Sequence, residues 1–492
     1  MDRFIPHMTW LESEIYIVLS ATLYFGLLTI VSFRVVLTRN QIGVSLAWLL
    51  LIFALPLVGM VGYFIFGELT LGAKRSKQRK LLAGEFLNWI QQQATTHKQS
   101  KDKISANAHS MQAFVESYTN MPMVKGNKHT LLTDTDQILL ELIKEIKASQ
   151  KHCYLMFYIC NEGGLINQLL NELKAAAARG VRCQLLLDSV GSHDFFNSAI
   201  PAQLRKAGVE VVEGLPVGAL RLLFQRQDLR LHRKLVCIDD HIAYTGSMNL
   251  VDPAFFNVHK GIGEWVDVMV RCEGPIVQHM QGLFVWDWCL ETEHVLNLPP
   301  ANNDLFCIEG DENSQLIPSG PEFGKVGIHQ VLLTAIYEAK YSLVLTTPYF
   351  VPDESLLTAL QVAAMRGVDV KIILPAKNDS LMVKYASRAF FEDLLSAGVE
   401  IHQFYGGLLH TKSIVIDEKI ALIGTVNLDR RSFWLNFEMT MLIDNAKFAG
   451  ELLTAQMHYT LASRQVSLVK WRQRSFFKRL LESIIYLFSP LL

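Results

Sequence analysis

The chain has 492 residues, with 46 Lys and Arg against 47 Asp and Glu, which leaves a formal net charge of -1. This near-zero charge disfavours a nucleic-acid-binding protein, because such proteins usually carry a basic excess. Hydrophobic residues make up 50% of the chain and charged residues 19%, and the mean hydropathy is +0.22. These values exclude a disordered or fibrous chain and indicate that part of it lies in lipid. The seven cysteines form no CxxC pair, so we expect neither a disulfide framework nor a zinc site.

The apolar excess is concentrated near the N-terminus, in two uncharged runs at about 15–33 and 44–66. At about 1.5 Å per residue, each run is long enough to cross a hydrocarbon core of about 30 Å as a helix. A cleaved signal peptide is the alternative for the first run. However, Glu12 and Glu14 stand where such a peptide has basic residues, and no A-x-A site follows. We therefore expect residues 1–80 to form a retained two-helix transmembrane hairpin with a basic flank.

The basic residues around these runs predict their orientation. Two lie between the runs and six lie outside them: Arg34 and Arg39 between, and Arg3, Lys74, Arg75, Lys77, Arg79 and Lys80 outside. Positive residues are enriched on the cytoplasmic side of membrane proteins. We therefore expect both ends of the hairpin, and everything after residue 80, on the cytoplasmic side.

Residues 81–118 are rich in Gln, Ser, Lys and Asn, which is typical of a polar linker or a surface helix. After this segment, apolar strand-like stretches alternate with helical ones, and their order repeats. Ala-Arg-Gly-Val at 178–181 corresponds to Met-Arg-Gly-Val at 365–368, and Ala-Gly-Val-Glu occurs at 207–210 and again at 397–400.

This repeated order predicts an α/β protein with two tandem copies of one domain, each with a mixed, largely parallel sheet flanked by helices. We place the first copy, called the first repeat, at 119–300 and the second copy, called the second repeat, at 301–465. A basic amphipathic tail follows them at 466–492.

Each repeat carries the motif H-x-K-x4-D, followed by G-[ST]-x-N at the same distance. The motif residues are His232, Lys234, Asp239 and Asn249 in the first repeat, and His410, Lys412, Asp417 and Asn427 in the second. The run after each His is apolar and β-branched, so it predicts a strand, in which residues i and i+2 share a face. An imidazole beside an ammonium group is a poor metal site, because a cationic Lys cannot act as a ligand. The pair suits an anionic phosphate instead, which Lys neutralises while His attacks phosphorus or donates a proton.

Two pairs of acidic residues accompany the motifs. Asp239 and Asp417 lie seven residues after their His, so on a regular strand they would face the opposite side, and each stands next to a tight turn. Either a structural or a catalytic role is therefore possible for them. Glu264 and Glu438 are candidates to hold the Nδ1 atom of a His and so set its tautomer. Their spacings from the His residues differ, and a solvated strand end is the alternative for both.

A doubled H-x-K-x4-D motif with trailing G-[ST]-x-N resembles the phospholipase D superfamily. Within it, the chain is similar over nearly its whole length to bacterial cardiolipin synthases of the A type. The stretches that carry this resemblance are Ala47-Trp48, Gly67-Glu68, Thr347–Pro352, His410–Ser413, Gly424–Ser432 and Phe488–Leu492. The resemblance implies a pseudo-twofold site where the two repeats meet, with no metal and no cofactor.

The resemblance further implies a reversible phosphatidyl transfer through a phosphohistidine, in which two phosphatidylglycerol molecules give cardiolipin and glycerol at the bacterial inner membrane. It assigns His232 as the nucleophile and His410 as the general acid and then base. Lys234, Lys412, Asp239 and Asp417 complete the catalytic set, and Asn249 and Asn427 donate hydrogen bonds to the phosphate. The alternatives are a membrane-bound hydrolase that uses water, or a transphosphatidylase that uses another alcohol.

Two further segments mix basic and apolar residues, as expected for contact with anionic lipids. The segment 215–234 is longer than its counterpart in the second repeat and contains Arg221, Arg226, Arg230 and Arg233. An amphipathic surface helix is its alternative. The tail from 470 to 492 has a basic start and an apolar end, which is typical of an interfacial anchor, with a docked terminal helix as the alternative.

Overall fold

The computed structural model describes residues 10–38, 42–68, 71–218, 226–299, 310–323 and 327–487. The chain divides into two compact units, which are described separately. The N-terminal unit contains Met1–Lys74 and Val217–Asp228, and the larger unit contains Arg75–Pro216 and Leu229–Leu492.

The N-terminal unit has one long apolar helix, α1 (Trp10–Leu37), whose stretch Glu14–Leu37 is long and apolar enough to cross a membrane. The second expected span, 44–66, is not one helix. It consists of α2 (Ile42–Ala54), α3 (Pro56–Gly62) and a π-helical turn, η1 (Tyr63–Gly67). The break falls at Leu55, because the residue before a proline is disfavoured in the α conformation and Pro56 has no N–H to continue the helix.

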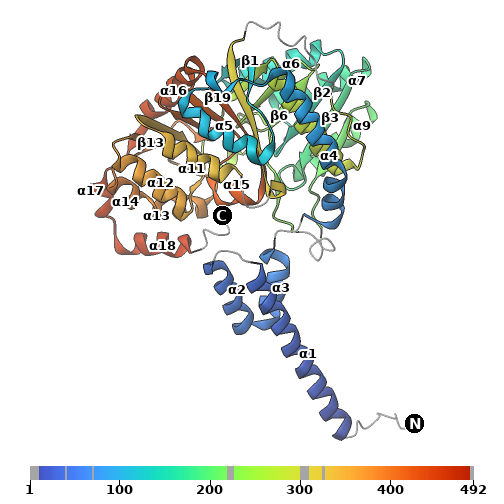
Figure 1. The fold of residues 1–492 in the computed structure, drawn as a ribbon, viewed down its shortest axis with the longest axis vertical. Coiled ribbons are helices and arrows are strands. Elements are labelled where there is room, and N and C mark those ends of the chain that lie inside the picture. The colour runs from blue at the N-terminus through green and yellow to red at the C-terminus, as the bar shows by residue number, and fades with distance from the viewer. Residues whose placement is uncertain are drawn as a thin grey trace. The chain divides into compact units, whose positions relative to one another are not determined.

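The short helices α2 and α3 fold back on one another beside α1 (Figure 1). A Cβ atom at Gly59 would lie 2.6 Å from the Cα atom of Ile52, so only glycine permits this approach. Val31 and Val35 of α1 pack with Ile52, Met60 and Tyr63 in a small apolar cluster. Within the described residues, the expected second transmembrane helix is therefore two short helices and a π-helical turn that fold back on each other.

The segment 81–118, expected as a linker or a surface helix, is mostly helical and packs into the larger unit. It contains most of α4 (Ala73–His97) and of α5 (Ala106–Thr119). Met111 and Val115 of α5 belong to the apolar core of the second repeat. These helices are thus part of the folded unit.

The larger unit is built on one mixed sheet that both repeats share. The first repeat contributes β1 (Val124–Leu132), β2 (His152–Phe157), β3 (Arg182–Asp188), β4 (Glu210–Gly214), β6 (Leu235–Ile238), β7 (Ile242–Gly246) and β9 (Met269–Glu273). The second contributes β10 (Glu312–Ser319), β11 (Ser342–Thr346), β13 (Asp369–Pro375), β14 (Glu400–Phe404), β16 (Ser413–Ile416), β17 (Ile420–Gly424), β19 (Asn436–Asp444) and β20 (Ser463–Gln465). Outside it, β12 (Phe350–Val351) pairs with β18 (Leu428–Asp429).

The antiparallel pair β1–β10 joins the two repeats, and equivalent strands follow outward in the same order on both sides. Only β2–β3–β4 and β11–β13–β14 run parallel within each half, so the expectation of largely parallel sheets is wrong. The reason is the motif itself, because β6–β7 and β16–β17 are antiparallel hairpins with three-residue turns between the pairs Ile238–Ile242 and Ile416–Ile420. The first two residues of each turn have positive φ, as the twist of a tight hairpin requires: Asp239 and Asp240 in one turn, and Asp417 and Glu418 in the other.

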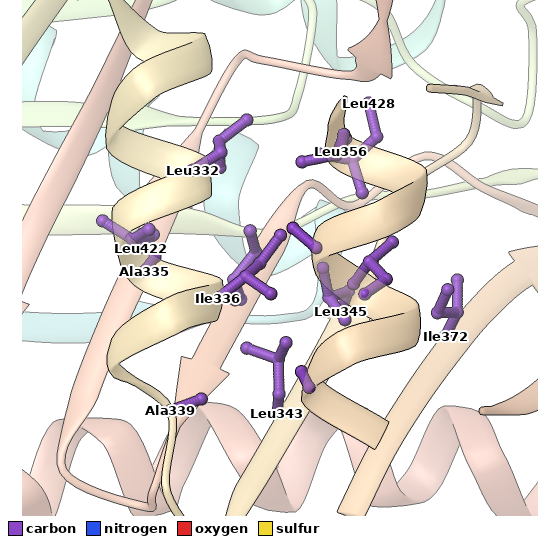
Figure 2. Close-up of a cluster of buried hydrophobic side chains, with 14 of the residues drawn as sticks. Leu332, Ala335, Ile336, Ala339, Leu343, Leu345, Leu356, Ile372, Leu422 and Leu428 are labelled. Atoms are coloured by element: carbon purple, nitrogen blue, oxygen red, sulfur yellow. The ribbon is translucent and has the colours of Figure 1, made fainter. Parts of the chain in front are cut away.

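Helices cover the sheet and enclose one apolar core in each repeat (Figure 1). In the first repeat they are α6 (Thr135–Ala148), α7 (Gly164–Ala178), α8 (His193–Phe196), α9 (Ile200–Lys206) and α10 (Ile276–Thr292). In the second they are α11 (Ile328–Glu338), α12 (Glu354–Met365), α13 (Leu381–Ala389), α14 (Phe391–Ser396), α15 (Arg430–Trp434) and α16 (Ala446–Leu461), followed by α17 (Leu468–Arg472) and α18 (Phe476–Tyr486). Figure 2 shows how Leu332 and Ile336 of α11 and Leu356 of α12 pack on the strand residues Leu343 and Leu345.

Candidate active site

The short strand before each motif His pairs with the other repeat. In the first repeat, β5 (Arg230–Leu231) runs parallel to the start of β19, and Arg230 and Leu231 are in register with Asn436 and Phe437. In the second, β15 (Leu408–Leu409) runs parallel to β8 (Trp265–Val266) in the same way. The main-chain N–H of His232 then donates to the carbonyl of Phe437 (2.9 Å), and that of His410 to the carbonyl of Val266 (2.8 Å). This pairing between the repeats places each His beside the residue that follows its hydrogen-bond acceptor in the opposite repeat.

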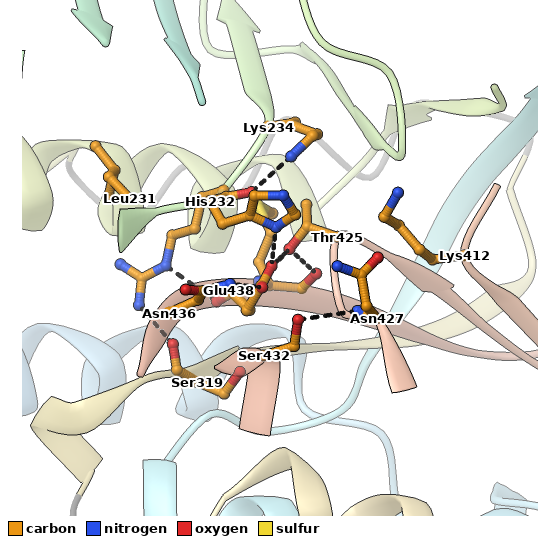
Figure 3. Close-up of polar contacts among 12 residues, drawn as sticks. Leu231, His232, Lys234, Ser319, Lys412, Thr425, Asn427, Ser432, Asn436 and Glu438 are labelled. Atoms are coloured by element: carbon orange, nitrogen blue, oxygen red, sulfur yellow. Dashed lines mark hydrogen bonds and ion pairs between the residues drawn. The ribbon is translucent and has the colours of Figure 1, made fainter. Parts of the chain in front are cut away.

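That next residue is a buried carboxylate in both cases. His232 Nδ1 lies 2.8 Å from Glu438 Oε2 (Figure 3), and His410 Nδ1 lies 2.7 Å from Asp267 Oδ1. Because an ionised carboxylate only accepts hydrogen bonds, each Nδ1 carries the proton and each Nε2 keeps its lone pair. Thr425 Oγ1 donates to Glu438 and Ser247 Oγ to Asp267, both from the G-[ST]-x-N motif.

The two motif lysines lie close to the His residues, as the i, i+2 spacing predicts. Lys234 Nζ donates to the carbonyl of His232 (2.9 Å), and Lys412 Nζ to that of His410 (2.6 Å). Burial lowers the pKa of Lys234 to about 8 and that of Lys412 to about 7. Both ammonium groups are poorly solvated, so an anion beside them would be bound strongly.

Burial disfavours the protonated form of both imidazoles. Burial lowers the pKa of His232 to about 4, although Glu438 acts in the opposite direction. Burial likewise lowers the pKa of His410, against the effect of Asp267. Burial alone would raise the pKa of Glu438, but His232 and Lys234 outweigh it, and the net pKa is lowered. A neutral ring with a free Nε2 lone pair is the form that can act as a nucleophile or base.

Both His residues line one pocket of about 410 Å³, to which both repeats contribute. The ring centroid of Tyr158 lies 4.9 Å from that of His232, and the ring centroid of Trp265 lies 4.3 Å from that of His410. Other lining residues include Asn161, Asp194, Arg230, Lys260, Tyr349, Asp379, Asp429 and Arg431. The pocket is therefore lined by both acidic and basic side chains and contains one imidazole from each repeat.

The two motif asparagines also line this pocket. Asn249 Oδ1 accepts the N–H of Ile159 (3.2 Å), which fixes the orientation of its side-chain amide. Asn427 Oδ1 is buried and has no hydrogen-bond partner among the described residues. Both side-chain amides thus lie at the pocket, although the hydrogen bonding of their oxygens differs.

The motif aspartates lie elsewhere. The Asp239 carboxylate accepts the N–H groups of Gln150, Lys151 and His152 at 2.7–2.9 Å. Neither Asp239 nor Asp417 lines the pocket. For Asp239, this position corresponds to the structural alternative and not to a catalytic contact.

Asp417 repeats this pattern in the second repeat. It accepts the N–H groups of Lys340, Tyr341 and Ser342 and the side-chain amide of Asn107. Each motif Asp therefore ties the turn of its hairpin to the start of the neighbouring strand, outside the residues that line the pocket.

Of the two candidate His-orienting residues, Glu264 and Glu438, only Glu438 contacts a His among the residues that the structure describes. Glu264 is exposed, and the candidate role falls instead to Asp267, three residues later, which the sequence reasoning missed. The equivalence of Asp267 and Glu438 follows from strand pairing. The N–H of Ser247 bonds to the carbonyl of Val268 and that of Thr425 to the carbonyl of Met439, and each of these acceptors is one residue after the carboxylate. Counting from the His hid this equivalence because the loop before Asp267 is longer than the one before Glu438.

A buried ionic network supports the Glu438 side of the site. Arg233, expected to face lipid, has its side chain fully buried; it pairs with Asp287 and with Glu322 (2.8 Å), and its Nε donates to the Glu438 carbonyl (3.0 Å). Arg75 is also buried, pairs with Asp287 and stacks on the Phe437 ring at 4.4 Å.

The remaining basic residues of segment 215–234 have separate environments. Arg230 lines the pocket, and Arg226 pairs with Asp228 (2.6 Å). Arg221 lies outside the described residues. Within the described part of the chain, no three His, Cys, Asp or Glu side chains are grouped so that they could hold a metal ion.

Comparison with known proteins shows which family the chain resembles. The family described as "Cardiolipin synthase, PLD-like domain" matches residues 142–288 and 332–457, and "Phospholipase_D-nuclease N-terminal" matches 27–68. The chain is 45% identical to cardiolipin synthase A of Yersinia pseudotuberculosis, over 95% of this chain and 97% of that protein. It is 46% identical to cardiolipin synthase A of Edwardsiella ictaluri, over 98% of this chain and 100% of that protein. The fold resembles phosphatidylserine synthase of Haemophilus influenzae, with a TM-score of 0.59, 13% identity and coverage of 78% of this chain and 100% of that one.

Proposed function

The chain belongs to the family of cardiolipin synthases with PLD-like domains, and from this premise we propose that it joins two phosphatidylglycerol molecules into cardiolipin and glycerol. The chain is accordingly a phospholipid phosphatidyltransferase. The observation that carries the proposal is the single pocket with two imidazoles, each held at Nδ1 by a carboxylate of the opposite repeat. Such a site can use one ring to form a covalent bond to phosphorus while the other handles the proton.

In the first half-reaction, His232 Nε2 attacks the phosphorus of one phosphatidylglycerol. The bond from phosphorus to the glycerol head-group oxygen breaks, and protonated His410 donates its proton to that oxygen as glycerol leaves. The negative charge of the entering phosphodiester favours the protonated form of His410, which Asp267 also stabilises. Lys234 and Lys412 neutralise the non-bridging oxygens, and the amides of Asn249 and Asn427 donate hydrogen bonds to them.

In the second half-reaction, neutral His410 takes the proton from a glycerol hydroxyl of a second phosphatidylglycerol. That oxygen attacks phosphorus, the bond from phosphorus to His232 breaks, and cardiolipin forms. Each half-reaction exchanges one primary alcohol for another, so the whole is reversible. We assign Asp239 and Asp417 to hairpin stability, and Glu438 and Asp267 to orientation of the two rings.

We place the N-terminal unit in the bacterial inner membrane and the larger unit on its cytoplasmic side, with α1 crossing the bilayer. The helices α2, α3 and η1 fold back to the C-terminal end of α1, where Glu68 pairs with Arg34 (2.5 Å). The length and apolar character of α1 and the family match at 27–68 support membrane attachment. Arg75 and Arg79 contact Glu291 and Glu322 within the larger unit, so the exposed basic flank is formed by Lys74, Lys77 and Lys80. These three lysines still favour a cytoplasmic location for the larger unit.

The test is incubation of the purified chain with phosphatidylglycerol labelled in its phosphate. We expect labelled cardiolipin and free glycerol, and after rapid acid-free quenching a phosphatidyl adduct on a peptide that contains His232. Phosphatidic acid as the main product would contradict the proposal and favour the hydrolase. Formation of the adduct on the peptide of His410 instead would reverse the roles of the two rings.

A further inference from the structure

The last described helix, α18, packs on the larger unit through its charged side. Glu482 is only 3% exposed and accepts hydrogen bonds from Arg388 Nε (2.9 Å) and Arg474 Nη1 (2.7 and 2.6 Å). Arg388 belongs to α13, beside which α18 lies (Figure 1). Ile485, one turn later on the same side, packs against the core of the second repeat. A buried ionic cluster therefore fixes the rotation of α18.

The opposite side of α18 is apolar and exposed to solvent. Phe476 is 70% exposed and Phe477 is 79% exposed, and the rest of this outward face is formed by Leu480, Leu481, Ile484 and Leu487. The spacing of three or four residues keeps these side chains on one side of the helix. The helix is thus inverted relative to a helix on the surface of a soluble domain, which buries its apolar stripe and exposes its charges.

An exposed apolar helix face of this kind is stabilised when it contacts an apolar environment outside the chain. The outward face joins large side chains in one patch, which is unlike the single exposed apolar residues found on any protein surface. Lys478 and Arg479 are exposed within the same helix, so the surroundings of the patch are basic. An apolar face beside basic residues fits the boundary between acyl chains and anionic head groups.

We propose that α18 is an interfacial helix that inserts its outward face into an anionic bilayer and so gives the larger unit a membrane contact of its own. The inference rests on the proposed membrane attachment through α1, which keeps a bilayer at high effective concentration near α18. The helix on which α18 packs begins close to a residue of the pocket. Asp379, which lines the pocket, lies two residues before α13, the helix whose Arg388 holds Glu482.

The test uses the full chain with a photoreactive benzoylphenylalanine in place of Phe477, reconstituted in vesicles of equal parts phosphatidylcholine and phosphatidylserine. We expect light to produce a covalent lipid adduct on the peptide that contains position 477. The same probe at Tyr341, an exposed aromatic residue just before β11, should give no lipid adduct. The double variant K478E/R479E should lower the yield at 477 several-fold, as should vesicles of phosphatidylcholine alone.

The outcomes separate this inference from the proposed function. Protein that floats with the vesicles but forms no lipid adduct at 477 overturns the role of α18. An adduct to another copy of the chain in place of lipid also overturns it. Protein that does not float at all refutes the anchor and the inference together. Cardiolipin formation is measured separately on the unmodified chain, so its failure would concern the active site and not α18.

Discussion

His232 of the first repeat is oriented by Glu438, 206 residues further along the chain, with Nδ1 and Oε2 2.8 Å apart. The reciprocal pair, His410 and Asp267, is 2.7 Å apart. Both pairs arise from one feature of the main chain, the parallel pairing of β5 with β19 and of β15 with β8. Neither repeat alone can therefore assemble an oriented imidazole, so the two must act as one site.

Removal of the orienting charge should slow the chemistry and leave lipid binding nearly unchanged. In Glu438→Gln or Asp267→Asn the amide can donate to Nδ1 as well as accept, so the wrong tautomer becomes populated. We expect kcat to fall by about 10²- to 10⁴-fold with little change in KM. Steady-state assays in mixed micelles measure both constants. Glu264→Gln is the matched control, and an equal loss there would refute the assignment of Asp267.

The two imidazoles should behave as one unit when they are removed. His232→Ala and His410→Ala should each abolish cardiolipin formation, because each half-reaction needs a nucleophile or leaving group and a proton carrier. The double variant should be hardly slower than either single one, since residues that act together give strongly non-additive losses. Comparison of the three rate constants tests this. Losses that multiply would indicate two independent sites.

The pH dependence of kcat/KM should reflect the free enzyme's His and Lys groups. His232 is neutral above its lowered pKa of about 4, so deprotonation favours attack as pH rises through that value. Lys412 loses its charge as pH rises through about 7, so kcat/KM should decline there, with Lys234 following at about 8. Lys412→Arg should move the alkaline decline to higher pH, because guanidinium stays charged. An unchanged alkaline limb in this variant would exclude Lys412 as its source.

The motif aspartates should matter for stability more than for chemistry. Asp239→Asn and Asp417→Asn each leave main-chain N–H donors short of an acceptor, at a cost of about 1–3 kcal/mol. Thermal unfolding should show a lower Tm for both, while activity well below Tm is retained far better than in the His variants. Loss of activity without loss of Tm would contradict the structural role.

Excess glycerol should drive the reaction backwards. Glycerol and the glycerol head group of phosphatidylglycerol are both primary alcohols, so the bonds exchanged have similar energies. Wild-type protein given cardiolipin and glycerol should therefore form phosphatidylglycerol, which chromatography of labelled lipid measures. His410→Ala should not, because the incoming hydroxyl then has no base. Phosphatidic acid formed at a rate independent of glycerol would indicate hydrolysis.

Much of this site could be predicted from the sequence because its information is local and repeated. The two H-x-K motifs, the equivalent asparagines and the phosphate chemistry follow from residue type and spacing, and the structure places all four His and Asn side chains on one pocket. The sequence also predicts that Asp239 and Asp417 lie next to a turn, on the opposite side of the strand from the His. The sequence did not show whether these carboxylates lie at the turn or in the pocket, since their position depends on N–H groups of residues that stand 88 positions earlier for Asp239 and 76 for Asp417.

By itself the sequence determined the repeat, the apolar N-terminus and the identity of the two His-Lys pairs, because each of these is a short-range pattern. Only the tertiary structure decided that Asp267 and not Glu264 faces His410, that the sheet is mostly antiparallel, and that Arg233 is buried. The physical reason is that these features depend on which strands pair, and strand pairing joins residues far apart in the chain without leaving a periodic trace in either segment. The outward apolar face of α18 belongs to the same class, because a helical wheel shows two faces and only packing decides which one is buried.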